Sequence, residues 1–270
     1  MSNYAIYQPK GKAAEYAKWA CNFYVGCSNG CAYCYLKKGI GAKVLGGCVP
    51  TLKKCFRDED HALEIFRKEL KDNLTELKKY GLFFSFTTDP MLPETIGLTM
   101  AAINALVVNG IPIKILTKCA AWVDLFLSKN GPIVCLGKAV HNVAFGFTLT
   151  GHDELEPGAS TNQERIEAMQ KLHEAGFKTF ASIEPIIDLD SSFDMIMFSR
   201  GYCDLYKIGL MSGQKVDTAF YGLLRSFNLQ VVNTLSHYPA KVYWKESFTK
   251  HFSQFPAAGC NVNRDYNIFK

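Results

Sequence analysis

The stretch VAFGFTLT, residues 143–150, decides the fold class because its two faces differ in size and polarity. In an extended strand, alternate side chains point to opposite sides of the sheet. The large, apolar set is Val143, Phe145, Phe147 and Leu149. The small or hydroxylic set is Ala144, Gly146, Thr148 and Thr150. We therefore expect one face of this strand to pack on helices and the other face to line a cavity.

Strand-like and helix-like stretches alternate on both sides of this segment. Strands are expected to begin near residues 82, 112, 143, 178 and 204, and KVYWKES at 241–247 is a candidate seventh strand. Amphipathic helical patterns cover 58–81, 93–110, 120–131, 162–176, 191–199 and 217–236. Such alternation implies right-handed crossovers and a parallel sheet covered by helices, either an open doubly wound sheet or a barrel.

Polar side chains recur near the carboxyl ends of the expected strands, where α/β folds carry their sites. They are Asp89, Lys118, Glu184, Lys207 and Lys245. Each of them alone is equally consistent with a solvated strand end or a structural ion pair. Together they favour a functional site at this end of the sheet.

A second informative stretch is NFYVGCSNGCAYCY, residues 22–35, which spaces Cys27, Cys31 and Cys34 as C-x3-C-x2-C. The N-terminal MSNYAIYQPKGKAAEYAKWA has no apolar core of secretory length, and no later run approaches a membrane span. We therefore expect a soluble, cytoplasmic protein whose ten cysteines are reduced. The formal charge of +5 is too small to identify a partner, so nucleic acid is left open.

The three close thiols are better explained as metal ligands than as disulfides. A structural zinc site takes four protein ligands, and no second C-x2-C pair is present. Three thiolates suit a [4Fe-4S] cluster that keeps one iron open for chemistry, with Tyr33 as a flat apolar wall beside it. The alternative from another class is a non-catalytic metal-binding protein in which Cys21, Cys48 or Cys55 is the fourth ligand.

Four blocks, the first of which contains the cysteine motif, resemble radical S-adenosylmethionine (radical SAM) enzymes, in particular the branch that contains spore photoproduct lyase. The blocks are CNFYVGCSNGCAYCYLK, FTTDPMLPE, ILTKCAAWVDLF and GHDELEPGASTNQERIEAMQKLHEAGFKTFASIEPII. They follow one another in order over roughly residues 22–188.

The resemblance implies an α/β fold, a partial (β/α)6 barrel of the TIM type. The candidate seventh strand at the C-terminus lies beyond this family core. The resemblance further implies one domain over 1–270, with a core at about 17–212 and a helix, strand and lid segment at 213–270. It also implies a [4Fe-4S] cluster and S-adenosylmethionine as cofactors, with a one-electron donor such as flavodoxin or ferredoxin as partner.

The resemblance also assigns roles to individual residues. Cys27, Cys31 and Cys34 would bind the cluster, and Thr87, Thr88 and Asp89 would hold the methionine amino group. Lys118 would face the methionine carboxylate, and Thr148 and Glu184 would reach the ribose and adenine.

The substrate is the least determined part of the resemblance. Spore photoproduct lyase returns a hydrogen atom through a downstream cysteine and tyrosines, but Cys48 and Cys55 lie in a stretch, 39–56, that does not align with that donor. Lesion repair is therefore not expected. Modification of a nucleic acid or nucleotide is the first expectation, and modification of a peptide or small metabolite is the alternative.

Overall fold

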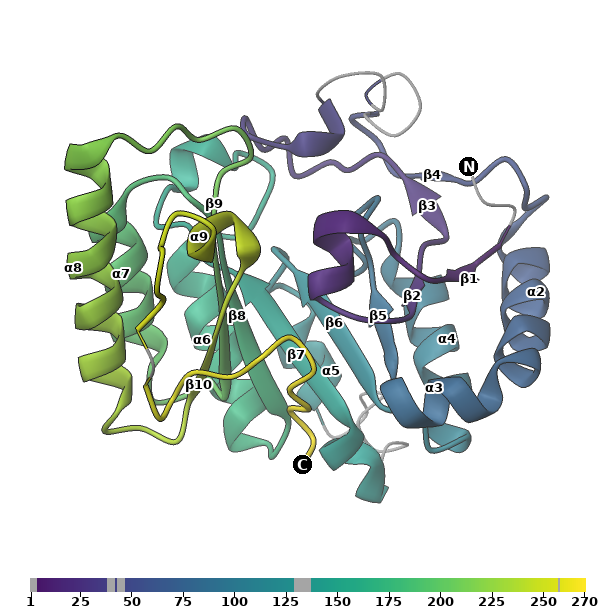
Figure 1. The fold of residues 1–270 in the computed structure, drawn as a ribbon. Coiled ribbons are helices and arrows are strands. Elements are labelled where there is room, and N and C mark those ends of the chain that lie inside the picture. The colour runs from purple at the N-terminus through teal and green to yellow at the C-terminus, as the bar shows by residue number, and fades with distance from the viewer. Residues whose placement is uncertain (1–3, 38–41, 43–46, 129–136, 257) are drawn as a thin grey trace.

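The computed structural model describes residues 4–37, 42, 47–128, 137–256 and 258–270. Its main feature is an eight-stranded sheet (Figure 1). In spatial order the strands are β1 (Ile6–Tyr7), β2 (Ala20–Cys21), β5 (Leu82–Phe84), β6 (Ile113–Thr117), β7 (Val143–Thr148), β8 (Lys178–Ile186), β9 (Leu205–Leu210) and β10 (Lys241–Trp244). The strands from β2 to β10 are parallel, and only β1 runs antiparallel to its neighbour.

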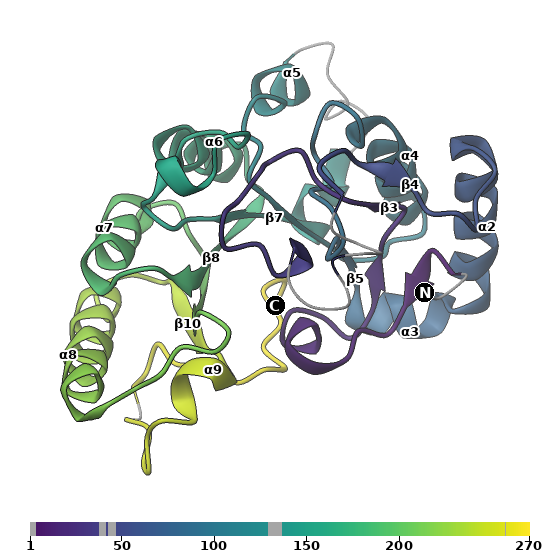
Figure 2. The ribbon, with the colours of Figure 1, turned by 90° about the horizontal axis from the view of Figure 1, so that it is seen from above.

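This sheet confirms the expected parallel α/β class and the candidate seventh strand, since β10 pairs with β9 with Lys241 opposite Leu205. The sheet is open, with β1 and β10 as its edges. Seen from above, α4 to α8 lie in an arc along the outer side of the sheet, while the N-terminal 3-10 helix η1 (Gly11–Glu15) and the C-terminus lie on the inner side (Figure 2). The helices thus cover one face, unlike those of a doubly wound sheet.

The helices follow the predicted patterns with two differences. They are α2 (Glu59–Asp72), α3 (Leu74–Tyr80), α4 (Ile96–Val108), α5 (Val123–Leu127), α6 (Asn162–Glu174), α7 (Leu189–Ser199), α8 (Thr218–Leu235) and α9 (Glu246–Thr249). The pattern at 58–81 is two helices, because the Asn73 amide donates to Glu69 O at 2.8 Å and ends α2. Helix α5 is shorter than expected, and residues 129–131 of that pattern lie outside the described residues. None of the described helices has the length and apolar character that a bilayer crossing requires.

The outer face of β7 packs on helices as its sequence predicts. The ring of Phe145 contacts Trp122, Phe126 and Phe177 at centroid distances of 5.0, 5.4 and 5.2 Å. Val143, Phe147 and Leu149 are fully buried in the same cluster. This aromatic contact fixes the helices of the central units against the sheet.

The inner face of β7 only partly matches the expectation of a cavity wall. A Cβ added to Gly146 would lie 2.2 Å from the ring of Phe180, so this part of the interior is filled by a side chain. Ala144 is buried in a cluster with Phe83 and Phe180. Of the small set only Thr148 lines the cavity, so the cavity-lining prediction was wrong for Ala144, Gly146 and Thr150.

Candidate active site

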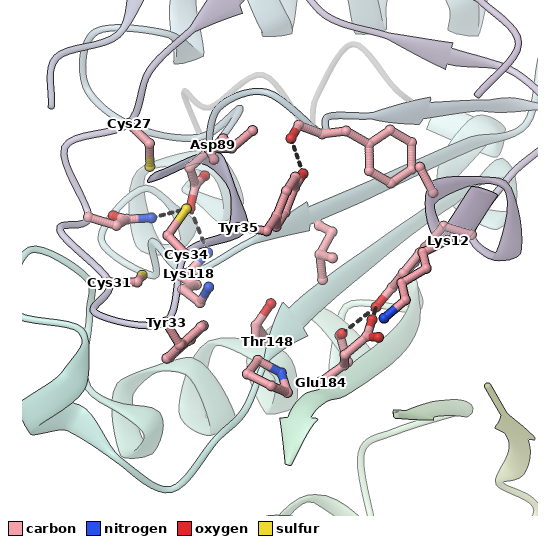
Figure 3. Close-up of a pocket in the computed structure, with 18 of the residues that line it drawn as sticks. Lys12, Cys27, Cys31, Tyr33, Cys34, Tyr35, Asp89, Lys118, Thr148 and Glu184 are labelled. Atoms are coloured by element: carbon pink, nitrogen blue, oxygen red, sulfur yellow. Dashed lines mark hydrogen bonds between the residues drawn. The ribbon is translucent and has the colours of Figure 1, made fainter. Parts of the chain in front are cut away.

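A cavity of about 360 Å³ lies at the carboxyl ends of the parallel strands. It brings together the cysteines, the strand-end residues and the cofactor contacts that the sequence predicts, except Lys207 and Thr87. The Thr87 hydroxyl instead donates to Tyr24 O at 2.6 Å. The predicted residues that line it are Cys27, Cys31, Tyr33, Cys34, Thr88, Asp89, Lys118, Thr148 and Glu184. Figure 3 shows the three cysteines at one end of the cavity and Lys12 and Glu184 at the other.

Glycines and a neighbouring turn shape the cysteine loop. Gly26 has a φ of 82°, and a Cβ there would lie 2.6 Å from Val49 O. The small sheet of β3 (Tyr24–Val25) and β4 (Thr51–Leu52) holds the start of the loop. Gly158 lies so close to the loop that an added Cβ would be 2.3 Å from Ser28 O. Glycine is therefore needed at Gly26, where the loop passes Val49, and at Gly158, where the neighbouring turn meets the loop.

The cysteines line a shared cavity but do not converge on one point. Within the described residues, no three Cys, His, Asp or Glu side chains are placed to hold a single metal ion. Each thiolate of an iron–sulfur cluster binds a different iron, so three cluster ligands must surround a volume. Cys21, Cys48 and Cys55, the candidate fourth ligands of a closed metal site, do not line this cavity. The three-cysteine arrangement fits a cluster better than a single zinc ion.

Burial favours the protonated thiols of Cys27 and Cys31 when no metal is bound. Desolvation, together with the nearby Asp89 charge, raises the pKa of Cys27 to about 11. Desolvation also raises the pKa of Cys31, against the opposing effect of Lys118. Thiolates at these positions therefore require a bound cation, and binding would release protons.

Asp89 is buried and its carboxylate is already fully hydrogen-bonded. Oδ1 accepts from Met91 N at 3.0 Å and Thr117 Oγ1 at 2.6 Å. Oδ2 accepts from Asn29 Nδ2 at 2.9 Å and Lys118 N at 2.7 Å. The carboxylate thus joins the cysteine loop to the ends of β5 and β6, and its direct role is to position these segments.

Two polar atoms beside Asp89 have no hydrogen-bond partner in the structure. Asn29 Oδ1 and Thr88 Oγ1 are buried and unpaired, and both residues line the cavity. Their exposed fractions are 3% and 8%. Because an unpaired buried polar group is costly, its presence at a cavity wall indicates a ligand that supplies donors there. Sequence reasoning did not identify Asn29.

A buried ion pair supports the cysteine end of the cavity. Arg165 Nη2 lies 2.7 Å from Glu156 Oε2, and neither side chain is exposed. Glu156 also accepts from the Tyr33 hydroxyl, and Lys118 Nζ lies 3.6 Å from its other oxygen. Burial and the Glu156 charge raise the pKa of Tyr33, so its phenol stays protonated.

Glu156 and Arg165 were missed by the sequence reasoning. A usable signal existed, because Arg165 falls on the same helical face as Met169 and Leu172, which are buried. An arginine on an apolar stripe needs a buried partner. The sequence does not say which acidic residue that partner is.

The opposite end of the cavity centres on Glu184. Its Oε2 accepts from Lys245 Nζ at 2.5 Å and from the Tyr16 hydroxyl at 2.9 Å. The Tyr16 hydroxyl also shares a hydrogen bond of 2.7 Å with Ser182, two residues before Glu184 on the same face of β8. Lys207 does not line this cavity, because it is the third residue of β9 and lies deeper in the interior. Its prediction as a strand-end residue of the site was wrong.

His152 ties the loop after β7 to the start of α7. His152 Nδ1 lies 2.6 Å from Glu154 Oε1, and its Nε2 contacts Asp188. Hydrogen bonds to Asp188 and then Glu154 raise the pKa of His152 above 6.5. Although burial opposes the change, hydrogen bonds from Ser191 and then His152 lower the pKa of Asp188 to about 2.

We expect this contact to stabilise the protein in a defined pH window. The His152 contribution is complete below pH 6.5 and is lost as the pH rises through the raised pKa of the folded state. The Asp188 contribution is present above pH 3.8 and is lost as the pH falls toward 2. The difference in melting temperature between wild type and His152→Gln should therefore be largest between these limits and shrink toward pH 9. An equal difference at pH 5.5 and pH 9 would contradict this assignment.

Comparisons with known proteins give a fold relationship and one distant sequence relative. A scan of protein-family models finds no match. The structure of Streptococcus suis SuiB bound to precursor peptide SuiA superimposes with a TM-score of 0.53 at 13% identity, over 84% of this chain and 48% of SuiB. The structure of SuiB bound to S-adenosylmethionine gives a TM-score of 0.49 at 14% identity, over 84% of this chain and 49% of SuiB.

In sequence, the uncharacterized protein MJ0683 of Methanocaldococcus jannaschii is 26% identical over 176 residues, or 63% of this chain and 61% of that protein. The matched region thus spans about half of SuiB and three fifths of MJ0683. At this level of identity, the first SuiB comparison shows that the two chains share a fold.

Proposed function

We propose that this protein is a radical S-adenosylmethionine enzyme whose open sheet is a partial barrel with the cofactors at its carboxyl end. The observation that carries the proposal is that the three cysteines of the C-x3-C-x2-C motif all line one cavity. A chance trio of cysteines would not be expected to meet the strand-end residues that the same resemblance names. These residues include Asp89, Lys118 and Glu184.

In this proposal Cys27, Cys31 and Cys34 hold a [4Fe-4S] cluster. When bound, the cluster supplies the electron that cleaves S-adenosylmethionine to methionine and a 5′-deoxyadenosyl radical, which abstracts hydrogen from the substrate. The chain's own residues bind and orient the cofactors and shield them from water. Thr88 and Asn29 offer oxygen acceptors to an amino group, and Lys118 offers a cation to a carboxylate. Thr148 and Glu184 lie farther along the cavity, on the side proposed for the nucleoside.

The substrate class has two candidates. Modification of a nucleic acid or nucleotide follows from the resemblance to the spore photoproduct lyase branch. Modification of a peptide is supported by the fold shared with SuiB, which was solved with its precursor peptide. A flavodoxin or ferredoxin is the proposed electron donor in either case.

The proposal is tested by purifying the protein without oxygen, reconstituting it with iron and sulfide, and reducing it with dithionite. We expect conversion of S-adenosylmethionine to 5′-deoxyadenosine, measured by liquid chromatography with mass detection. Cys31→Ala should give none, whereas Cys48→Ala should match wild type because exposed Cys48 does not line the cavity. A fully loaded cluster that yields no 5′-deoxyadenosine, even with cell extract added, would refute the proposal.

Thr88→Val should change stability and ligand binding in opposite directions. Its hydroxyl is buried and unpaired, so valine should raise the free energy of unfolding of cluster-free protein by about 1 kcal/mol. The same change should weaken binding of S-adenosylmethionine to the loaded protein by roughly tenfold, measured by equilibrium dialysis. Thr117→Val is the matched control, because Thr117 already donates to Asp89 and its loss should lower stability. A destabilised Thr88→Val with unchanged affinity would remove Thr88 from the binding site.

A further inference from the structure

A second, smaller cavity lies at the amino end of the sheet interior. Its volume is about 20 Å³, and Tyr16 lies between it and the candidate active site, because Tyr16 lines both. Its charged lining residues are Lys114, Lys207 and Arg264, and no carboxylate lines it. We call it the basic chamber. The remaining walls are aromatic or aliphatic, so these three cations dominate its electrostatics.

The three cations of the basic chamber share one structural task. Arg264 Nε donates to Ala14 O at 3.1 Å. Lys207 Nζ donates to Glu15 O at 2.8 Å, and Lys114 Nζ donates to Tyr16 O at 3.1 Å. They therefore cap the carbonyls at the C-terminal end of η1, where cations are favourable.

These carbonyl contacts supply no negative charge to offset the three cations. Among the described residues, no salt bridge involves Lys114, Lys207 or Arg264. Glu15 and Glu184, the acidic groups whose charges act on Lys207, are engaged by Lys245 at 3.5 and 2.5 Å. Lysine is rarely buried without an anionic partner.

The lowered pKa values of Lys114 and Lys207 reflect the cost of burying their charge. Burial alone lowers the pKa of Lys114 to about 8. Burial, then Lys114 and Lys245, lower the pKa of Lys207, against the opposing effect of Glu15 and Glu184. An anion in the chamber would favour the charged form of both amines.

We propose that the basic chamber binds a small inorganic anion the size of chloride, held by Lys114, Lys207 and Arg264. The chamber's volume is that of about one water-sized occupant, which excludes bulky organic anions. Lys114 gives only one of its three N–H donors to the protein, and Arg264 one of its five, so donors remain for the ion. Arg264 is exposed, which gives the ion a route from solvent.

The consequence is a link between the bound anion and the floor of the candidate active site. The anion would stabilise the lysines that hold the Tyr16 carbonyl, while the hydroxyl of Tyr16 bonds Glu184 on the other side. Anion binding in the basic chamber does not require the iron–sulfur cluster, so a negative result for one proposal leaves the other unaffected.

The test uses thermal unfolding of the full-length, cluster-free chain at constant ionic strength, with chloride progressively replacing gluconate. At pH 7 the melting temperature should rise with chloride and saturate, as expected for one binding site. The rise should be smaller at pH 9, above the pKa of about 8 for Lys114. It should be absent in Lys114→Met and retained in Lys10→Met, an exposed lysine next to η1 that lines neither cavity.

Bromide gives an independent readout that does not depend on the variants folding. Crystals of wild type grown or soaked in bromide should show one anomalous peak within hydrogen-bond distance of Lys114 and Lys207. Equal melting temperatures in chloride and gluconate would overturn the proposal. A chloride effect that persists unchanged in Lys114→Met, or bromide-treated crystals with no peak in the chamber, would also overturn it.

Discussion

Asp89→Asn is expected to lower the free energy of unfolding of cluster-free protein by about 2 to 4 kcal/mol. The carboxylate of Asp89 accepts hydrogen bonds from Asn29, Met91, Thr117 and Lys118. An asparagine replaces one acceptor oxygen with an NH2 group that must face donors, so at least one buried donor loses its partner. Urea unfolding monitored by circular dichroism measures the change.

This result would separate two roles for Asp89. As a ligand for a cationic amine alone, Asp89 would contribute nothing to the stability of the cluster-free chain. As the group that joins the cysteine loop to the ends of β5 and β6, it contributes in the absence of any ligand. Asp190→Asn, an exposed carboxylate in the first turn of α7, is the control and should change stability little. Equal stability of Asp89→Asn and wild type would favour the ligand role.

Arg165→Met is expected to lower the free energy of unfolding by about 3 to 5 kcal/mol, because it leaves Glu156 as an unpaired buried carboxylate. The guanidinium also donates to Ser160 O and Thr148 O at 2.8 Å, so the side chain ties α6 to the end of β7. Denaturant unfolding should show the loss in the cluster-free protein. Methionine preserves most of the volume, so the effect reports the charge and its hydrogen bonds.

The double variant Arg165→Met with Glu156→Gln separates two effects on the free energy of unfolding. One is the destabilisation caused by an isolated buried charge, and the other is the net contribution of the ion pair. Removing both charges should recover part of the lost stability, because no buried ion is left alone. Arg225→Met, an exposed position on α8, should be near neutral. A double variant less stable than Arg165→Met alone would show that Glu156 is stabilised by Tyr33 and Lys118 without Arg165.

Much of the fold could be predicted because each strand and helix carries its own periodicity. The pattern of β7 predicted its helix-facing side, and KVYWKES was predicted as a candidate seventh strand, which β10 confirms. The filled interior could not be predicted from β7 alone. Whether Gly146 faces a cavity depends on Phe180 of the neighbouring strand, which occupies that space. The choice between helices on one face and on both faces also depends on tertiary packing.

Those parts of the site that depend on the local spacing of residues could be predicted from the sequence. The cysteine triplet and the polar strand ends, such as Asp89 and Glu184, line the cavity as expected. The partners that hold them come from far along the chain. Tyr16 reaches Glu184 across 168 residues, and Tyr33 reaches Glu156 across 123. No local pattern indicates such pairs, and the engagement of Asp89 by four internal donors is visible only in three dimensions.

In the proposed function, Cys27, Cys31 and Cys34 hold a cluster with one iron left open to S-adenosylmethionine. The most direct measurement is the electron paramagnetic resonance spectrum of the reconstituted, dithionite-reduced protein, recorded before and after S-adenosylmethionine is added. We expect a reduced [4Fe-4S] signal that changes when S-adenosylmethionine is added and is missing in Cys31→Ala. A cluster signal that saturating S-adenosylmethionine leaves unchanged would contradict it, because the cluster would then have no open iron for the cofactor.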